Sequence, residues 1–525
     1  MGESLNKIVI VGGGTAGWLT AAVIAADHRV DGQPKPEITV IESPNVPTIG
    51  VGEGTWPSMR RTLGRTGISE IEFIAECSAS FKQGSKFVGW RKGAAEDDFY
   101  YHPFMLPSGY PDLSLAYGWQ TLASDYAFAE IVTNQQQVCE AGLAPKQKTT
   151  PEYASVVNYA YHLDAGKFGL LLQKRCTKNL GVEHIQAHVT EIESHENGDI
   201  ASIVCKDGQR VTGDLFIDCT GFASMLLGKH FGIPLISQSD VLFNDSALAT
   251  QVPYPESDTP IASATIGTAQ HYGWIWDIGL SSRRGVGHVY SSSHASDDKV
   301  EAALRAYLKG TISEAAWEAL QVRKISFSPG HRRQFWFKNC VAVGSAAGFI
   351  EPLEASALAL VELSAAAISE ELPANRQMMD ITARRFNERF LYHWARVIEF
   401  LKLHYVLSER SDSEFWLDNR RPETIPERLN ELLSLWRHQA PSSLDFTHIE
   451  EIFPAASYQY VLYGMGFETI FKPSRRSSYD LDSINRQFMQ NKQMLSKLKA
   501  GLPSNRTLLG FLTQKSADRI SVHSS

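Results

Sequence analysis

Two carboxylates, Glu351 and Glu354, stand in a short turn directly before a long apolar stretch. Apolar neighbours take a carboxyl group out of water and raise its pKa, which suits an acid or base that exchanges protons near neutral pH. The backbone amides of Ser356 and Ala357, at the expected start of the following helix, are placed to bind a small anion. The spacing predicts acid–base chemistry at Glu354 beside an anion site, and a helix-capping carboxylate stays open as the alternative.

A second group of residues has the spacing of a dinucleotide site. The pattern G-x-G-x-x-G is matched by Gly12, Gly14 and Gly17. These glycines allow a tight turn, close approach of a pyrophosphate and packing of a helix on a strand. The first helical residues, Thr15 and Ala16, then present backbone amides to the phosphate. Glu42, at the end of the next strand, is predicted to bind the ribose hydroxyls.

These residues need a parallel sheet to position them. Buried strands are expected at 7–11 and 37–41, with a helix over 15–26 between them. Two later segments, 214–222 and 339–348, again combine an apolar strand with a glycine turn. Three strand-and-glycine-turn segments that are far apart in the chain and meet at one site favour FAD over a nicotinamide. We predict an α/β fold of the FAD-binding, glutathione-reductase or hydroxylase type.

A glycine-punctuated loop at 47–57 is expected to approach the same ligand through its backbone. The predicted cofactor site therefore also includes Gly52, Glu53, Gly344 and Ile350.

Aromatic residues gather in the remaining segments. A helix is expected over 59–82 and a strand over 86–90, followed by the dense aromatic run 99–104. This run suits the lining of a flat aromatic ligand, and a core patch under a loop is the alternative. Trp274 and Trp276 alternate, so they share one face of a strand.

The length and composition set the outline of the molecule. A chain of 525 residues is too long for one compact core. We expect an FAD-binding module over 1–372, with substrate-binding insertions at about 80–200 and 225–335, a largely β layer at 240–330, and a helical C-terminal region over 373–525.

The charge and the cysteines narrow the class of protein. The formal net charge of −8 argues against nucleic-acid or anionic-membrane partners. The six cysteines show no metal-binding spacing and are expected to be reduced core residues. With no signal peptide or long apolar run, a soluble, cytoplasmic protein is expected.

Several of these motifs resemble the flavin-dependent tryptophan halogenases. The resemblance spans residues 8 to about 467 and rests on 12–18, 47–55, 80–87, 242–253, Trp274-x-Trp276 and Glu351-Pro-Leu-Glu354. It implies that reduced FAD from a separate reductase, with O2 and chloride or bromide, generates hypohalous acid. Lys82 matches the lysine that presents the halogen to the substrate, with Lys86 as the less favoured second lysine. Glu354 matches its partner glutamate.

The same resemblance assigns the aromatic residues. Substrate contacts are implied for His102, Phe104 and Phe453, and a barrier between flavin and substrate for Trp274 and Trp276. The chain departs from the family pattern at Gly279, where proline is expected, and at Ala355-Ser356-Ala357, which replaces Ser-Thr-Gly.

The chain also departs from the family pattern near Pro441, Ser442 and His448, in the region that binds the charged groups of a free amino acid in the family. A site without those polar groups loses specificity for a zwitterion. We therefore predict indole or an indole derivative as the substrate, and leave open whether the chain forms a homodimer.

Two other classes of protein stay open at this point. A flavin monooxygenase would hydroxylate or epoxidise an aromatic substrate, and a flavin-binding protein without turnover would not need Lys82 or Glu354. Hydroxylases of this fold usually carry Gly-Asp where this chain has Gly344-Ser345, so the halogenase is the favoured prediction.

Overall fold

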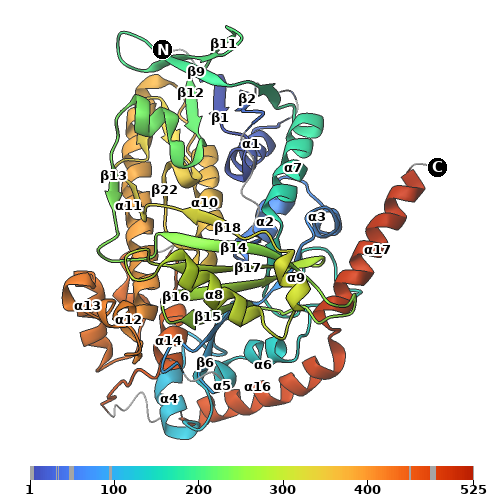
Figure 1. Ribbon diagram of the computed structural model, residues 1–525, viewed down its shortest axis with the longest axis vertical. Coiled ribbons are helices and arrows are strands. Elements are labelled where there is room, and N and C mark those ends of the chain that lie inside the picture. Colours follow the sequence, from blue (N-terminus) through green and yellow to red (C-terminus); the bar gives the residue numbers. More distant parts are fainter. Residues whose placement is uncertain are drawn as a thin grey trace. The chain divides into compact units, whose positions relative to one another are not determined.

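The computed structural model describes residues 5–30, 32, 35–45, 52–93, 97–448, 451–472 and 481–523 (Figure 1). Residues 47–51 of the predicted glycine loop lie outside the described ranges. The chain divides into two compact units of three segments each. Unit 1 comprises Met1–Ala79, Leu163–Ser239 and Phe327–Trp394, and unit 2 comprises Ser80–His162, Asp240–Ser326 and Ala395–Ser525. The functional division at residue 372 stays a prediction.

Unit 1 is built on a six-stranded sheet with the order β20-β21-β12-β1-β2-β8. Its strands are β1 (Lys7–Val11), β2 (Glu37–Glu42), β8 (Glu183–Gln186), β12 (Leu215–Asp218), β20 (Trp336–Phe337) and β21 (Cys340–Ala342). The central strand β1 pairs in parallel with β2 and β12, so Ile8 lies beside Ile38 and Leu215. Because β1 is buried from Ile8 onward, it has the continuous apolar sequence typical of parallel sheets.

Helices and smaller sheets complete unit 1. The helices are α1 (Thr15–Asp27), α2 (Ser58–Arg65), α3 (Glu70–Glu76), α7 (Ala165–Arg175) and α10 (Ser356–Glu370). The further strands are β3 (Glu53–Gly54), β9 (Val189–Ser194), β10 (Ile200–Cys205), β11 (Arg210–Thr212), β13 (Leu235–Ser237), β19 (Gly330–Arg332) and β22 (Gly348–Phe349). Helix α1 packs against both α7 and α10. Thr15, the first residue of α1, lines the same cavity as Ser356, the first residue of α10.

Unit 2 contains a seven-stranded sheet with the order β18-β14-β17-β16-β15-β5-β6. Its strands are β5 (Gly84–Val88), β6 (Phe99–Pro103), β14 (Ser246–Pro253), β15 (Thr265–Gln270), β16 (Gly273–Gly279), β17 (Arg283–Tyr290) and β18 (Arg323–Ser326). Beside it, β4 (Ser80–Lys82) pairs antiparallel with β7 (Ala160–Leu163). This is the β layer that was expected at 240–330, with the segment 84–103 added to it.

Helices make up most of the remainder of unit 2. They are α4 (Leu115–Leu122), α5 (Phe128–Val132), α6 (Gln135–Glu140), α8 (Asp297–Leu308), α9 (Glu314–Glu318), α12 (Glu414–Asp418), α13 (Glu427–Trp436), α14 (Ala455–Gly464), α16 (Leu481–Gly501) and α17 (Asn505–His523). The long helix α11 (Arg376–Val406) contributes residues to both units. None of the helices in the described ranges combines the length and apolar composition that crossing a bilayer requires.

One local prediction was wrong. The helix expected over 59–82 is two short helices, α2 and α3, followed by strand β4, because the last residues pair with β7 instead of continuing a helix. The six cysteines are all free and buried, as predicted.

Candidate functional site

The glycine turn after β1 can be made only by glycine. Gly12 has φ +116°, and a Cβ there would lie 2.1 Å from the carbonyl oxygen of Cys219. A Cβ on Gly17 would lie 1.9 Å from the carbonyl oxygen of Gly12, so α1 can approach the strand only without a side chain. Within the described ranges nothing lies within 4 Å of that position at Gly14, and the N-cap side chain makes no capping bond to α1. The turn thus leaves open space at uncapped amides, as a phosphate site requires.

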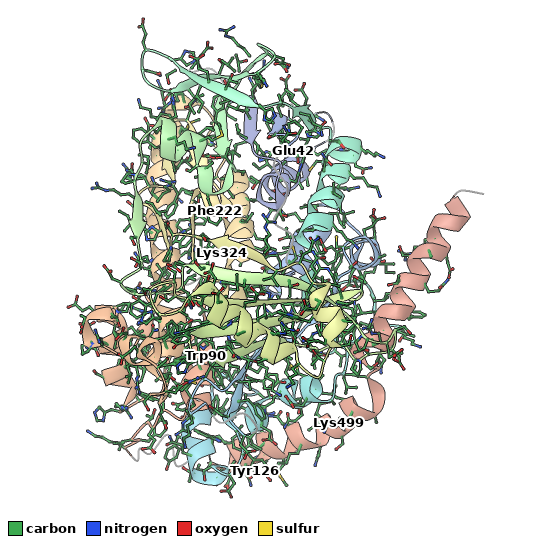
Figure 2. All side chains as sticks on the ribbon, viewed as in Figure 1. Glu42, Trp90, Tyr126, Phe222, Lys324 and Lys499 are labelled. Carbon is green, nitrogen blue, oxygen red and sulfur yellow. The ribbon has the colours of Figure 1, made fainter. Side chains whose placement is uncertain are left out.

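Glu42 lies at the end of β2 beside this turn (Figure 2). A Cβ on Gly13 would lie 2.2 Å from the Glu42 carboxyl carbon. His184 Nε2 lies 2.9 Å from Glu42 Oε2, and Gln173 Nε2 donates a hydrogen bond to the same oxygen at 3.3 Å. The carboxylate is therefore held next to the glycine turn, and its binding of a ribose stays a prediction.

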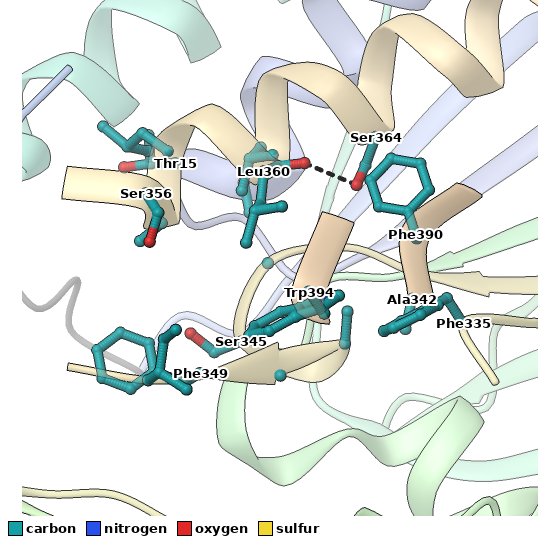
Figure 3. Close-up of a pocket in the computed structure, with 18 of the residues that line it drawn as sticks. Thr15, Phe335, Ala342, Ser345, Phe349, Ser356, Leu360, Ser364, Phe390 and Trp394 are labelled. Atoms are coloured by element: carbon teal, nitrogen blue, oxygen red, sulfur yellow. Dashed lines mark hydrogen bonds between the residues drawn. The ribbon is translucent and has the colours of Figure 1, made fainter. Parts of the chain in front are cut away.

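A cavity in unit 1 collects most of the remaining predicted cofactor and halide residues. The predicted residues that line it are Thr15, Ala16, Glu53, Gly344, Ile350, Ser356 and Ala357. Figure 3 shows the hydroxyl groups of Ser356 and Ser345 pointing toward each other from different walls. A Cβ on Gly344, where φ is +69°, would lie 2.8 Å from Ala16 Cβ. Gly52, with φ +93°, is buried near Glu53 in the chain but does not line this cavity.

One wall of the cavity is aromatic and was not predicted. Phe386, Phe390 and Trp394 line it from α11, one helical turn apart; Figure 3 labels Phe390 and Trp394. The Phe386 and Phe390 rings stack with centroids 4.2 Å apart, and Phe335 lies parallel to Trp394. The spacing of four between these three residues was the available sequence signal. A cavity with glycine turns, uncapped amides and a flat aromatic wall fits a dinucleotide that carries a flavin ring.

The turn before α10 is strained. Glu354 has φ 65° and Ala355 has φ 55°, in the left-handed region that costs a non-glycine residue about 1–3 kcal/mol. The indole Nε1 of Trp56 donates a hydrogen bond to the Glu354 carbonyl oxygen at 2.8 Å, which holds this turn in place. No side chain caps α10, so the amides of its first turn are open to an anion. Glu354 itself is buried, 7% exposed.

The two candidate lysines of unit 2 have different surroundings. Lys82 ends strand β4, is 1% exposed, and its Nζ lies 5.3 Å from the centroid of the Phe104 ring. Lys86 is only partly buried, and its Nζ lies 2.7 Å from Glu140 Oε1 in an ion pair. An ammonium that is buried beside an aromatic ring is the better candidate for chemistry on an aromatic substrate. Lys82 and Glu354 belong to different units, and their cooperation stays a prediction.

The predicted substrate residues also lie in unit 2. His102 Nε2 lies 2.9 Å from Ser457 Oγ, and the His102 and Phe453 rings are 6.4 Å apart. Phe453 stacks on Phe400 with centroids 3.9 Å apart. His102 and Phe453 are thus brought together, whereas Phe104 is placed by its contact with Lys82. Phe400 was not predicted.

A polar network shares the strand face of Lys82. Ser80 Oγ donates a hydrogen bond to the Gly279 carbonyl oxygen at 2.5 Å and lies 3.5 Å from His162 Nδ1. His162 Nε2 lies 2.8 Å from Thr265 Oγ1. Burial, reinforced by the positive charge of Lys82, lowers the pKa of His162 well below its usual value. Sequence reasoning missed this network because its members are far apart in the chain.

The two barrier tryptophans occupy one face of β16, as predicted. Trp274 and Trp276 are 2% and 5% exposed, with ring centroids 6.4 Å apart. Trp90, labelled in Figure 2, packs against Trp274. A Cβ on Gly287 of the neighbouring strand would lie 2.2 Å from the Trp276 ring, so this glycine makes room for the indole.

The departures from the family pattern have local explanations. At Gly279 a Cβ would lie 3.0 Å from Ile261 and 3.1 Å from the Tyr254 hydroxyl, which occupy the space of a side chain. Pro441 accepts a hydrogen bond from Gln459 Nε2 at 2.8 Å through its carbonyl oxygen, and Ser442 caps a short turn. His448 is exposed, and residues 449–450 lie outside the described ranges.

Known proteins are similar to this chain in sequence and in fold. Residues 7–476 match the tryptophan halogenase family model. The solved structure of a tryptophan halogenase from Shewanella frigidimarina NCIMB 400 is 50% identical, with a TM-score of 0.94 and 98% of each chain covered. That of BrvH, a flavin-dependent halogenase from Brevundimonas sp. BAL3, is 31% identical, with a TM-score of 0.84 and 97% of this chain and 99% of that chain covered.

A curated relative agrees with the family model. The tryptophan 7-halogenase RebH from Lentzea aerocolonigenes is 30% identical over 549 residues, which cover 98% of this chain and 99% of RebH. The chain therefore belongs to the tryptophan halogenase family and is a flavin-dependent halogenase.

Proposed function

We propose that this enzyme uses reduced FAD, O2 and chloride or bromide to halogenate an electron-rich aromatic, indole or an indole derivative. Bound reduced FAD, supplied by a separate flavin reductase, provides the electrons with which O2 and halide yield hypohalous acid. The observation that carries the proposal is Lys82, a buried ammonium 5.3 Å from an aromatic ring centroid and on the same strand face as a neutral polar network.

Each residue has a physical role in this scheme. The amides of Ser356 and Ala357 hold the halide at the uncapped start of α10. The Lys82 ammonium holds hypohalous acid by hydrogen bonding and directs its halogen at the ring. One aromatic C–H bond is replaced by a carbon–halogen bond, and the hydroxyl of the hypohalous acid leaves as water. Glu354 accepts the ring proton.

The aromatic residues provide orientation instead of chemistry. His102, Phe104 and Phe453 offer flat faces on which an indole can stack. Trp274 and Trp276 keep the substrate apart from the flavin, so oxygen is not transferred to the ring directly. With Pro441 and Ser442 engaged by backbone contacts, the region offers little for the charged groups of a free amino acid.

The substrate proposal is tested with the enzyme, a flavin reductase, FAD, NADH and a panel of indoles that includes tryptophan. Reactions run in bromide and in chloride and are analysed by mass spectrometry, where isotope patterns identify halogenated products. We expect halide-dependent products with a higher kcat/KM for indole than for tryptophan. Hydroxylated products that need no halide would contradict the reaction, and a far higher kcat/KM for tryptophan would contradict the substrate.

A further inference from the structure

Among the described residues, Glu53 alone brings an ionisable side chain to the wall of the unit 1 cavity. It belongs to the short strand β3, and within the same ranges its carboxyl group makes no hydrogen bond or ion pair. The rest of the wall is apolar or carries hydroxyl groups, on Thr15, Ser345, Ser356 and Ser364. A carboxylate that faces a cavity loses part of its hydration, which favours its neutral form.

The start of α10, which lies in the same cavity, attracts anions. Helix α10 is 15 residues long, and no side chain caps its first amides. Ser356, its first residue, is 2% exposed and lines the cavity with no side-chain hydrogen bond among the described residues. Figure 3 shows this hydroxyl at the start of α10, turned into the cavity. A buried hydroxyl at an uncapped helix start can donate to an anion together with the amides.

Direct contacts connect the segment of Glu53 to this helix start. Trp56, three residues after Glu53, donates its indole hydrogen to the carbonyl of Glu354, two residues before Ser356. Farther along, Ser58 and Thr62 both donate to the carboxylate of Glu362 on α10. The segment 53–62 is thus fixed against α10, and Glu53 and Ser356 share one cavity of about 170 Å³.

We propose that Glu53 couples halide binding to proton uptake, so that a halide enters this cavity when the Glu53 carboxyl group is neutral. The inference rests on the proposed function, because it takes the halide to bind at the start of α10. Because Glu53 and Ser356 line one cavity, a halide at the start of α10 and an ionised Glu53 carboxylate are two like charges in the same space, and their repulsion should weaken binding about tenfold. Uptake of one proton removes that repulsion.

The carboxyl group of Glu53 gains or loses its proton near neutral pH. Burial alone raises the pKa of Glu53 to about 7, with no contribution from a neighbouring charge. None of the other ionisable side chains that the structure describes lines the cavity; those on the neighbouring segments include Arg60, Arg61, Glu351, Glu354, Glu362 and His393. Since the raised pKa lies near neutrality, halide affinity should be highest below pH 7 and fall as the pH rises through this value.

The test measures binding instead of turnover. The full chain loaded with oxidised FAD is titrated with bromide by calorimetry at about pH 6 and about pH 8.5. We expect the Kd of the wild type to rise at least about tenfold over this range, and Glu53→Gln to bind with an affinity that does not depend on pH. Glu362→Gln is the matched control, because it removes a buried carboxyl group outside the cavity; it should keep the wild-type dependence.

A second measurement covers the case in which Glu53→Gln does not fold. Titrating the wild type near pH 8 in two buffers with different heats of ionisation reports the protons taken up per bromide. We expect an uptake of roughly 0.4 proton or more, because tenfold coupling leaves Glu53 only partly protonated in the complex at that pH. A wild-type affinity that does not change with pH, an unchanged dependence in Glu53→Gln, or no proton uptake would overturn the proposal. If halogenated product still forms in such a case, the proposed function stands and only the role of Glu53 is wrong.

Discussion

His162 is a buried imidazole whose neutral state links stability to pH. It is fully buried beside Ser80 and Thr265, and burial together with Lys82 lowers its pKa well below the usual 6.5. As the pH falls below about 6.5, the unfolded chain takes up a proton that folded His162 does not bind. This group therefore lowers the free energy of unfolding as the pH falls.

Replacing His162 removes that dependence. In His162→Asn the loss of unfolding free energy between about pH 7 and pH 5 should be smaller than in the wild type by about 1–2 kcal/mol. Urea denaturation at both pH values measures it. His438→Asn, at an exposed position, is the control and should follow the wild type. Equal losses in His162→Asn and the wild type would show that His162 is not held neutral.

The difference between the two lysines could be only partly predicted. The sequence motif singled out Lys82 over Lys86, but the helix expected over 59–82 placed Lys82 at a helix end where the structure has a buried strand. No local pattern indicates burial by β7, which lies far along the chain. For the same reason His162, Thr265 and Gly279 could not be recognised as neighbours.

At the scale of elements, one glycine on β17 makes room for a tryptophan ring of β16. Gly287 lies opposite Trp276, and an added Cβ would lie 2.2 Å from the indole. In Gly287→Ala the ring has to move, which should cost about 1–3 kcal/mol of stability, as overpacking of a core does. Thermal unfolding measures this loss. Gly510→Ala on α17, where nothing lies within 4 Å of the new Cβ, should be neutral or slightly stabilising.

The contact between α2 and α10 contains a buried carboxyl group. Glu362 accepts hydrogen bonds from Thr62 Oγ1 and Ser58 Oγ, yet burial raises its pKa to about 7. The group binds a proton more tightly in the folded state, so its stabilising effect is complete below about pH 4.5 and is lost as the pH rises through 7.

A variant without this ionisation should lose less stability at high pH. Between about pH 5 and pH 8, Glu362→Gln should lose up to about 3 kcal/mol less unfolding free energy than the wild type. Denaturation at the two pH values tests this. Glu370→Gln, at an exposed position on the same helix, should lose as much unfolding free energy as the wild type. If Glu370→Gln also lost less, the effect would come from the change in surface charge.

The nucleotide-binding elements could be predicted because each is locally complete. Strand β1, the glycine turn and α1 follow each other directly, so their residues show the apolar run and the glycine spacing without reference to distant segments. The boundary between α3 and β4 could not be predicted, since Ser80–Lys82 become a strand only through pairing with Ala160–His162. Tertiary pairing overrides local helix preference there.

At the scale of the whole molecule, the proposed function uses different parts of the two units. Unit 1 holds the glycine turns, Glu53, Glu354 and the uncapped start of α10. Unit 2 holds Lys82, the aromatic residues predicted to contact the substrate and the two tryptophans predicted to separate it from the flavin. We therefore predict that flavin chemistry and halogen transfer can be separated by mutation.

Lys82→Ala tests this central claim most directly. The variant is compared with Lys86→Ala, which removes a lysine that is ion-paired with Glu140, in reactions that contain a flavin reductase, FAD, NADH, bromide and indole. Brominated product and the rate of flavin reoxidation are both measured. We predict that Lys82→Ala lowers product formation about 100-fold or more while flavin reoxidation continues, and that Lys86→Ala retains both. Normal bromination by Lys82→Ala would contradict the account.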